Sequence, residues 1–512
     1  MKLICLTKKD CLPRLLEAWS NVKIRAMNIQ KINFCFLSIL LLILAAACQR
    51  ETTKRTNIVL LLADDLGHHE LGAYGQQVIQ TPYLDALAAK SMRFTNFYAG
   101  NSVCSPSRAV LLTGKSSTRV PIRGNAGFFG DDKWEGVYLD PDTFTLGEMF
   151  KAANYQTAFV GKWHLDDPDT PATWAFGHGF DFAAQEQWSA RFGKRDFNKP
   201  GLWLNGDQIH IPYDFKVHDC KDAFYTDTAF KFLDQIEQDK PFFLFMSYRA
   251  PHSFEGPIRD TLSYAKTDWP KVEQAQAAKV TLQDQQVGRL LDKLASTGEL
   301  DNTIVLYASD NGAHFAADGN GHDLEFFNSN GNLKGGKRDL YEGGLRVPLL
   351  VYWKDKIEAG STSDHISAFH DLMPTFADII QTEKPAQTNG ISFLPTLLNK
   401  AQEKHAFLNW ELQLSGWFQT ISNGGFRQAA RMDKWKAVRY GIDSDIELYD
   451  LSKDESESKD IAADHPATVQ RFNEIFENER NNTAGFPYGG VKQDYKSQDK
   501  YTNKNGSLEK IN

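Results

Sequence analysis

Short, continuous apolar runs that alternate with helical patterns constrain the fold of this sequence more than any other feature. The first run, residues 56–63, reads Thr-Asn-Ile-Val-Leu-Leu-Leu-Ala and shows no alternation of polar and apolar side chains. A strand of this kind is covered on both faces, as in a parallel sheet between two layers of helices. Similar runs occupy residues 157–160, 241–247, 303–308 and 347–352, and helical patterns occupy residues 83–90, 143–154, 223–238 and 271–294. The alternation predicts an α/β fold with a doubly wound, mixed sheet flanked by helices.

The pattern changes near residue 400, where shorter strand-like pieces replace the long runs. These pieces lie at residues 406–412, 426–430, 435–440 and 447–451, and a helical pattern follows near residues 466–479. We therefore predict a main domain over residues 56–395 and a smaller C-terminal subdomain with an antiparallel sheet over residues 396–490. Residues 491–512 are rich in Lys, Asp, Asn and Ser, which predicts a flexible tail.

Residues 1–48 are typical of an export segment. An apolar run at residues 33–48 follows Lys31 and ends in small residues, as in a secretory signal, and it is too short to span a membrane comfortably. Leu44-Ala-Ala-Ala-Cys48 resembles a bacterial lipobox, in which the signal is cut before the cysteine and that cysteine is acylated. We expect a bacterial lipoprotein that is exported to the periplasm or the outer membrane and cell surface. A plain cleaved signal and an uncleaved anchor remain alternatives, and Met27 is an alternative start.

The chain has six cysteines, and four of them belong to the export segment: Cys5, Cys11, Cys35 and Cys48. Because Cys48 would carry the lipid, only Cys104 and Cys220 remain as thiols after export, and two distant thiols do not form a disulfide scaffold. Cys220 lies in an apolar helical context, so we expect it to pack in the core. Cys104 lies in a polar segment with an arginine and is the candidate reactive thiol.

Acidic residues follow two of the predicted strands, although the chain as a whole does not attract anions. Its net charge is -8, which excludes general affinity for nucleic acid and requires any anion site to be built locally. Asp64 and Asp65 follow the first strand, and Asp310 and Asn311 follow the strand at residues 303–308. Carboxylate and amide oxygens without an interleaved His or Cys form a hard site that suits calcium or magnesium rather than zinc. Taken alone, the first acidic pair could merely cap a turn.

The segment Cys104-Ser-Pro-Ser-Arg108, followed by Ala-Val-Leu-Leu-Thr-Gly-Lys115, resembles the signature of the formylglycine-dependent sulfatases, which belong to the alkaline phosphatase superfamily. In that family a formylglycine-generating maturation enzyme reads Cys-x-Pro-x-Arg and oxidises the thiol to an aldehyde. The segment after the cysteine has a helical pattern, so Cys104 is expected at a helix N-terminus, where the backbone N–H groups favour an anion. Arg108, one turn later, can orient the hydrated aldehyde or contact sulfate oxygens. A cysteine that only caps a short helix is the alternative.

Three further motifs match the family in order. The family pattern implies that Lys162 of Gly161-Lys-Trp-His164 binds sulfate and that His164 removes a proton as sulfate leaves. It implies that His252, in Arg-Ala-Pro-His252, binds sulfate near the ester oxygen, and that Lys337 protonates or stabilises the leaving oxygen. Without the family context, these residues would be read as ordinary loop residues. Lys334 and Arg338 are expected to be solvated or recognition charges.

The resemblance runs from about residue 57 to residue 462 and is to the arylsulfatase A and N-acetylgalactosamine-6-sulfatase branch. It implies an alkaline-phosphatase-like fold and one calcium ion. The implied ligands are Asp64, Asp65, Asp310, Asn311 and an oxygen of the modified Cys104. The expected activity is hydrolysis of a sulfate ester on a sulfated saccharide.

Two rival functions remain open at this point. One is a phosphonate or phosphate monoester hydrolase of the same superfamily, and the other is a glycan-binding surface lipoprotein whose cysteine is never matured. The tryptophans Trp188, Trp203, Trp269 and Trp417 either pack or stack on sugar rings, and packing is the better expectation for each.

Overall fold

A computed structural model describes residues 54–129, 134–186, 201–206, 209–252, 258–314, 322–415 and 425–491, and the backbone of residues 501–504 and 507–510. The chain divides after Lys54, and Arg55–Asn512 forms one compact unit. The expected export segment, Met27, Cys48, Trp188 and Trp417 lie outside the described residues, so the predictions made for them stay predictions. Among the described helices, none is both long and apolar enough to cross a membrane.

A sheet of ten strands forms the centre of the described fold, and its middle is parallel. The strands lie in the order β13-β2-β12-β11-β1-β10-β6-β7-β8-β9. Their bounds are β1 (Asn57–Asp64), β2 (Met92–Phe94), β6 (Gln156–Lys162), β7 (Phe182–Glu186), β8 (Gly201–Leu204), β9 (Ile209–Pro212), β10 (Phe242–Pro251), β11 (Thr303–Ser309), β12 (Leu349–Trp353) and β13 (Thr362–Ser363). The strands β11, β1, β10, β6 and β7 are parallel neighbours, whereas β12 and β8 pair antiparallel to the ends of this block. The predicted mixed α/β sheet is confirmed.

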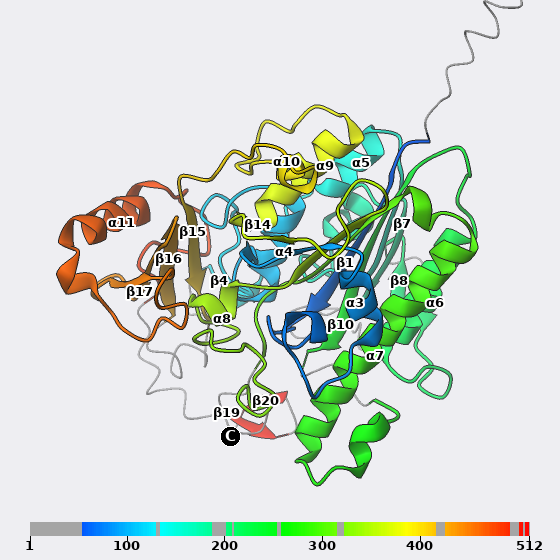
Figure 1. Cartoon of the computed structure of the whole chain (residues 1–512), viewed down its shortest axis with the longest axis horizontal. Helices are drawn as coiled ribbons and strands as arrows, with labels where there is room; N and C mark the ends of the chain where they lie inside the picture. The colour runs from blue at the N-terminus through cyan, green and yellow to red at the C-terminus, as the bar shows by residue number, and fades with distance from the viewer. Residues whose placement is uncertain are drawn as a thin grey trace, which may run out of the picture. The chain divides into compact units, whose positions relative to one another are not determined.

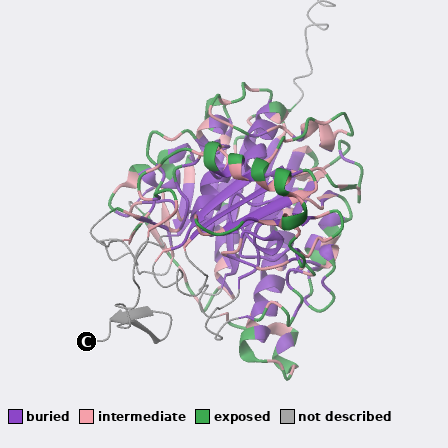
Figure 2. Cartoon of the chain, turned by 90° about the vertical axis from the view of Figure 1, so that its left-hand side faces the viewer, coloured by how far each residue is buried: buried purple, intermediate pink, exposed green. Residues whose placement is uncertain are grey.

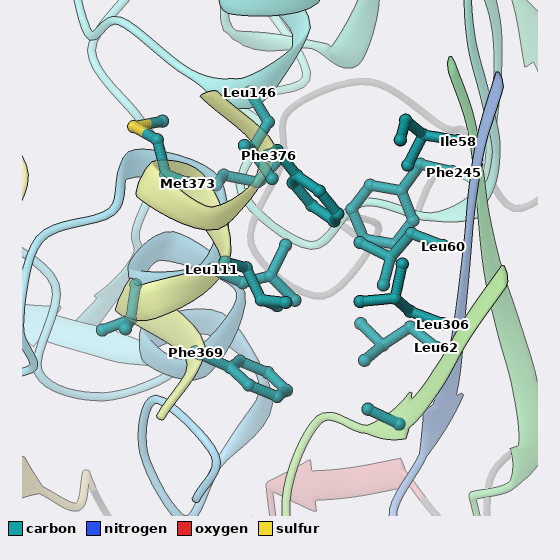
Figure 3. Packing of buried hydrophobic residues seen from close by; sticks show 14 of the residues in the cluster. Ile58, Leu60, Leu62, Leu111, Leu146, Phe245, Leu306, Phe369, Met373 and Phe376 are labelled. Carbon is teal, nitrogen blue, oxygen red and sulfur yellow. The ribbon is translucent and has the colours of Figure 1, made fainter. Parts of the chain in front are cut away.

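Helices cover both faces of this sheet, because the side chains of β1 alternate between two separate cores. Ile58, Leu60 and Leu62 face α4 (Cys104–Thr113), α5 (Leu146–Ala152) and α9 (Leu372–Ile380), and Figure 3 shows this layer at close range. Val59 and Leu61 face α3 (Pro82–Ala88), α6 (Lys221–Leu233) and α7 (Lys271–Ser296), of which α6 and α7 lie side by side in Figure 1. Figure 2 shows the consequence, a buried sheet between partly exposed helices. The continuous apolar run of β1 is therefore explained by burial on both faces.

A second sheet of four antiparallel strands follows, as the sequence predicts. It consists of β15 (Leu408–Gln413), β16 (Phe426–Met432), β17 (Trp435–Tyr440) and β18 (Glu447–Asp450), and α11 (Pro466–Asn478) packs against it. Smaller described elements are β3 (Phe97–Tyr98), β4 (Ala126–Phe128), β5 (Trp134–Gly136), β14 (Ser367–Ala368), α8 (Glu342–Leu345), α10 (Leu394–Leu397), β19 (Tyr501–Lys504) and β20 (Ser507–Lys510). The predicted domain boundaries and the flexible tail are not tested by these elements and stay predictions.

The four-stranded sheet is joined to the loop around α8 by a buried ion pair. Lys436 on β17 donates to Glu342 at the start of α8, with Nζ 2.8 Å from Oε1, and neither side chain is exposed. Glu457 lies 3.4 Å from the same ammonium and accepts the backbone N–H of Glu342 at 2.7 Å. Burial acts to raise the pKa of both carboxyl groups, and the charge of Lys436 acts to lower it. The pKa of Glu342 falls to about 2, because the cations outweigh burial, whereas that of Glu457 rises to about 7, because burial dominates. Lys436 therefore lies between one carboxyl group that is ionised at neutral pH and one that titrates near neutral pH.

We expect Lys436→Met to lower the free energy of unfolding by about 3–5 kcal/mol, because it leaves the buried Glu342 carboxylate without its main cation. Urea titration followed by fluorescence measures the change. The double variant Lys436→Met/Glu342→Gln is the control, and it should lose much less stability than Lys436→Met, since no unpaired charge remains. A loss below about 1 kcal/mol in the single variant would contradict the described ion pair.

Helix α3 is capped by a side chain from another helix. Its own N-cap, Thr81, makes no capping hydrogen bond, and instead Asp284 of α7 accepts the N–H groups of Leu84 at 2.7 Å and Tyr83 at 3.2 Å. Burial of this carboxyl group raises the pKa of Asp284 to about 7, even though the two N–H groups act in the opposite direction. The folded protein therefore binds the Asp284 proton more tightly than the unfolded chain does, whose aspartates titrate near 3.8.

Because the pKa of Asp284 is raised in the folded protein, its contribution to stability is fully present below about pH 4 and is lost as the pH rises through about 7. We expect Asp284→Asn to flatten the fall in stability between pH 5 and pH 8, because the amide does not titrate. Urea midpoints of both proteins at these two pH values measure the difference, and other titrating groups cancel in the comparison. Equal slopes for the two proteins would contradict the raised pKa.

Candidate active site

Four neighbouring strands of the main sheet end beside one another and carry the polar residues predicted to act. The strand order β11-β1-β10-β6 places their carboxyl ends at one edge of the sheet. Asp64 ends β1, Lys162 ends β6, and Asp310 follows β11 directly. His252 follows β10. Ligands of doubly wound sheets bind at this edge, outside the strand ends.

Cys104 is the first residue of α4, as the sequence predicts, and it faces the aspartates of β1. Its side chain is buried, and Sγ lies 3.5 Å from Oδ1 of Asp64 and 3.9 Å from Oδ1 of Asp65. Burial raises the pKa of the Cys104 thiol to about 12, although the charges of Lys162 and Lys337 oppose the rise. The unmodified side chain is therefore a protonated thiol at neutral pH, which is a poor nucleophile.

Asp64 is fully buried and is held by two cations from neighbouring strands. Nζ of Lys162 lies 2.9 Å from Oδ1 and 2.7 Å from Oδ2, and Nη1 of Arg249 donates to Oδ2 at 3.2 Å. Burial acts to raise the pKa of this carboxyl group, but the charges of Lys162, Arg249 and Arg108 outweigh it, so the pKa of Asp64 lies below its ordinary value. Asp64 is accordingly ionised at neutral pH.

Asp65 is bound by a third cation and lies beside two further predicted residues. Nζ of Lys337 lies 2.6 Å from Oδ2, Nε2 of His252 lies 3.5 Å from the same oxygen, and Nδ2 of Asn311 donates to Oδ1 at 2.8 Å. Burial again acts to raise the pKa, and Lys337 and Lys162 together bring the pKa of Asp65 below its ordinary value. Four segments that are distant in the sequence thus meet at one carboxylate.

Asp310 is bound by Arg108 from the helix that carries the cysteine. Nε and Nη2 of Arg108 lie 2.9 Å and 2.8 Å from Oδ2 of Asp310, and the backbone N–H of Asp65 donates to Oδ1 at 3.1 Å. Nη1 of Arg108 donates to the carbonyl of Lys162 at 2.6 Å and to Oγ of Ser247 at 2.5 Å. Burial and the charge of Asp64 raise the pKa of Asp310 to about 6. In this arrangement Arg108 ties α4 to the ends of β11, β6 and β10.

The two predicted histidines are neutral at neutral pH. Burial lowers the pKa of His252 well below its ordinary value, and the nearby charge of Lys337 adds to the effect. Burial and Lys162 do the same for the pKa of His164, whose backbone carbonyl accepts the hydroxyl of Ser105 at 3.0 Å. An unprotonated imidazole can accept a proton or donate its single N–H, whereas the buried ammonium groups are the charged donors of the site.

Sequence reasoning missed two members of the site, Arg249 and Ser247. Both lie in β10 and are fully buried, and Arg249 also lies 3.7 Å from Glu186 at the end of β7. The signal was present, because an arginine directly before Ala-Pro-His252 at the end of an apolar strand must find a buried anion. The fold brings five predicted catalytic residues together with the predicted aspartate and asparagine ligands: Cys104, Arg108, Lys162, His252 and Lys337. His164 lies beside Ser105, the residue after Cys104.

A family model described as "Sulfatase" matches residues 56–383, and a model described as "N-sulphoglucosamine sulphohydrolase, C-terminal" matches residues 335–481. The chain belongs to the sulfatase family. The N-acetylgalactosamine-6-sulfatase of Homo sapiens is 32% identical over 366 residues, which cover 67% of this chain and 66% of the human protein. The chain thus spans about two thirds of that relative.

Other relatives agree with this assignment. The N-acetylglucosamine-6-O-sulfatase of Bacteroides thetaiotaomicron is 27% identical over 551 residues, covering 86% of this chain and 90% of that protein. The crystal structure of Ps i-CgsB in complex with k-i-k-neocarrahexaose matches with a TM-score of 0.70 and 25% identity over 84% of this chain and 95% of that one. The resemblance to sulfatases and the predicted fold class are both confirmed.

The acidic side chains of this sulfatase fit a hard cation. Asp64, Asp65, Cys104 and His252 offer ligand atoms that lie within 4.8 Å of one another. The Oδ1 atom of Asn311 is buried and has no hydrogen-bond partner among the described residues, which is costly unless a ligand satisfies it. Two ionised carboxylates and an available amide oxygen are the donor set that calcium takes. The identity of the ion stays a prediction, as do the individual roles of its ligands.

A second group of metal-ligating side chains, His370, Asp371 and His405, has a structural explanation instead. Asp371 accepts the N–H groups of Ala368 and Ile391 at 2.8 Å each, and Nε2 of His405 lies 2.8 Å from Oδ1. Its carboxylate therefore closes the turn before α9 and joins it to the chain near Ile391. Burial lowers the pKa of His370 to about 4, whereas Asp371 raises the pKa of His405 against the effect of burial, so Asp371 and His405 form an ion pair.

We expect calcium to raise the melting temperature of the purified protein and Asp65→Asn to reduce this effect. Saturating a site at 100 times its dissociation constant stabilises a protein by about 2.7 kcal/mol. Loss of one carboxylate charge should raise the calcium concentration for half the shift by about tenfold or more. Differential scanning fluorimetry with calcium or with a chelator measures the shift without any need for activity.

Asp284→Asn is the matched control, because it removes a buried aspartate outside the site, and it should keep the calcium response of the unaltered protein. A calcium shift of the same size and midpoint in Asp65→Asn would rule out Asp65 as a ligand.

Proposed function

We propose that this sulfatase hydrolyses a sulfate ester of a sulfated carbohydrate, with Cys104 acting after its conversion to formylglycine. The observation that carries the proposal is the position of Cys104. Its buried Sγ lies at a helix N-terminus, 3.5 Å from Asp64, whose carboxylate also holds Lys162. A thiol with a pKa near 12 does not supply a thiolate there, so the chemistry needs a different nucleophile at the same position.

Hydrated formylglycine supplies two hydroxyl groups. One attacks sulfur as Asp310 takes its proton and the bond from sulfur to the alcohol oxygen breaks, and the deprotonation of the other later expels sulfate. Bound calcium would polarise the sulfate group. Asp64, Asp65, Asp310 and Asn311 would hold that ion. Lys162 and Lys337 carry the ammonium groups that can turn from Asp64 and Asp65 to the sulfuryl oxygens as negative charge develops there. Because Lys162 ends a strand and Lys337 lies in a distant loop, they can contact the sulfate group from two sides.

Two proton transfers are assigned to Lys337 and His164, because Lys337 is protonated and His164 is not. Lys337 stays charged, because the attraction of Asp65 outweighs burial and raises the pKa of its ammonium, so Lys337 holds a proton for the leaving oxygen. His252 lies beside the same carboxylate and binds sulfate near the ester oxygen through its N–H. His164, which is neutral, accepts the proton of the second hydroxyl as sulfate is expelled. Arg108 fixes Asp310 and α4, so that the nucleophile is held in place.

The substrate class and the cellular context complete the proposal. The relatives named above include an N-acetylgalactosamine-6-sulfatase and an N-acetylglucosamine-6-O-sulfatase, and Ps i-CgsB is complexed with a neocarrahexaose. These names support a sulfated saccharide as substrate. The Cys-x-Pro-x-Arg motif supports a formylglycine-generating maturation enzyme as partner, and the lipobox-like sequence before Cys48 supports export as a lipid-anchored protein to the periplasm or cell surface.

Cys104→Ala should lower sulfate ester turnover by roughly 10⁴-fold or more, because the variant cannot form the nucleophile. Its melting temperature should stay close to that of the parent. Release of 4-nitrophenol from 4-nitrophenyl sulfate measures activity, and mass spectrometry of the peptide around Cys104 in the active parent should show a mass about 18 Da below that of the thiol form. Cys220→Ala is the control, since it removes a buried cysteine outside the site, and it should remain active.

Three results would overturn the proposal. An unmodified thiol in a fully active parent would exclude formylglycine, and an unmodified thiol without activity would instead indicate a glycan-binding protein. Faster hydrolysis of phenyl phosphonate or phosphate esters than of the matching sulfate would make the chain a phosphonate or phosphate monoester hydrolase of the same superfamily.

A further inference from the structure

Arg338 directly follows Lys337 and is fixed to the segment that carries the nucleophile. Its backbone N–H donates to the carbonyl of Ser102 at 2.8 Å, two residues before Cys104. The preceding N–H, that of Lys337, donates to the carbonyl of Ala313 at 2.9 Å. The loop that carries both cations is therefore joined by backbone hydrogen bonds to both sides of the site, which limits where the Arg338 side chain can reach.

The guanidinium of Arg338 lies on the side of the site where His252 is found. Its Nη2 lies 3.3 Å from Nε2 of His314, and the rings of His314 and His252 are 5.8 Å apart between centroids. His314 is neutral, because burial and the charges of Lys337 and Arg338 lower its pKa well below the ordinary value, so it can accept from the guanidinium. The side chain of Arg338 is half-buried, and burial lowers its pKa while the charge of Asp65 opposes the change.

The backbone at Arg338 is in a conformation that a side chain disfavours. Its φ angle is +82°, in the left-handed region that glycine adopts without strain. The conformation is maintained from the C-terminal sheet, since Nη1 of Arg427 donates to the Arg338 carbonyl at 2.6 Å and to Asp339 at 3.0 Å. An arginine at a position suited to glycine, next to the lysine of the site, is consistent with a side chain that has a function.

Arg338 adds a positive charge beside the cations that hold the described carboxylates of the site. Lys162 and Arg249 hold Asp64, and Lys337 holds Asp65. Arg108 holds Asp310, and Arg427 holds Asp339. Arg338 thus increases the positive potential around a substrate that already carries one sulfate. A substrate with a second negative charge would match this potential better than a monoanion would.

We propose that Arg338 binds a second anionic group of the substrate, a carboxylate or a further sulfate, on the sugar that carries the scissile ester or on its neighbour. This inference rests on the proposed function and narrows its substrate class to saccharides with two or more negative charges. The planar guanidinium is suited to it, because it can donate two parallel hydrogen bonds to a carboxylate or sulfate group. The anion would take its place beside His314, outside the position of the reacting sulfur.

The test uses two variants of the mature enzyme. Arg338→Gly removes the side chain, and glycine suits the φ of +82°, so the loop should keep its conformation. Arg338→Lys keeps the charge but cannot donate two parallel hydrogen bonds to one anion. Lys334→Ala is the matched control, because it removes a cation of the same loop that lies 3.8 Å from the ring of Tyr341 and 3.1 Å from the hydroxyl of Tyr449. All proteins are assayed with 4-nitrophenyl sulfate and with a panel of defined sulfated mono- and disaccharides.

The panel pairs monosulfated with disulfated forms of one sugar, and uronate-containing disaccharides with their carboxyl-reduced forms. Arg338→Gly should lower kcat/KM for the multiply charged member of a pair by about 10- to 100-fold, mainly through KM, and leave 4-nitrophenyl sulfate and the singly charged member within about twofold. Arg338→Lys should fall between the parent and Arg338→Gly, and Lys334→Ala should behave as the parent. The pair that responds identifies the anion as sulfate or carboxylate.

An equal loss on singly and multiply charged substrates would overturn the inference and assign Arg338 a structural role. So would a parent enzyme that hydrolyses 4-nitrophenyl sulfate but favours no multiply charged saccharide of the panel. Neither result would affect the proposed function. A matured parent that hydrolyses neither aryl sulfate nor any saccharide would instead contradict the proposed function itself.

Discussion

Burial of ionised aspartates at the end of the central sheet is the constraint on which the rest of the site depends. Asp64 and Asp65 are fully buried, and taking a carboxylate out of water is unfavourable by several kcal/mol unless cations and hydrogen bonds replace the water. Lys162, Arg249 and Lys337 provide that replacement from three different segments. The proposed function places the sulfate group beside the same cations. The interactions that make the fold tolerable therefore also prepare the site for an anionic substrate.

The four-stranded sheet contributes to this site although none of the expected catalytic residues belongs to it. Lys436 holds Glu342 at the start of α8, and Arg427 holds the carbonyl of Arg338 and the side chain of Asp339. The loop with Lys337 is thus fixed between the two sheets. A buried charge network of this kind has few alternative arrangements, because each displaced member would leave an unpaired charge. The match of a C-terminal sulphohydrolase model to residues 335–481 begins at this loop and includes this sheet.

Membership of the sulfatase family explains the reacting groups at the strand ends. It does not explain which substrate is chosen. Fold and reacting groups are shared among enzymes with different substrates, so specificity must come from side chains around the reacting group. Arg338 is the neighbour of Lys337 in the sequence, His314 lies shortly after Asp310 and Asn311, and the two side chains contact each other. The proposed recognition of a second anion and the proposed chemistry would therefore depend on the same two segments.

Much of this could be predicted from the sequence because its signals are local. The apolar run of β1 predicted a strand buried on both faces, the Cys104 segment predicted a helix N-terminus, and the motifs identified the family. The direction of β12 could not be predicted, since an apolar run is equally buried in a parallel or an antiparallel strand. Lys334 was expected to be solvated or to recognise substrate. Its contact with Tyr449 depends on a sheet that lies more than a hundred residues away in the sequence.

The sequence by itself determined which groups the protein has for its chemistry: a thiol in a maturation motif, hard oxygen donors after two strands, and lysines and histidines after others. Only the tertiary structure decided which of them meet. Arg108 was expected near the nucleophile or the sulfate, and the structure shows that it also binds Asp310. Arg249, given no role beforehand, holds Asp64. The physical reason is that ion pairing between buried groups depends on distance through space, which the order of residues along the chain does not specify.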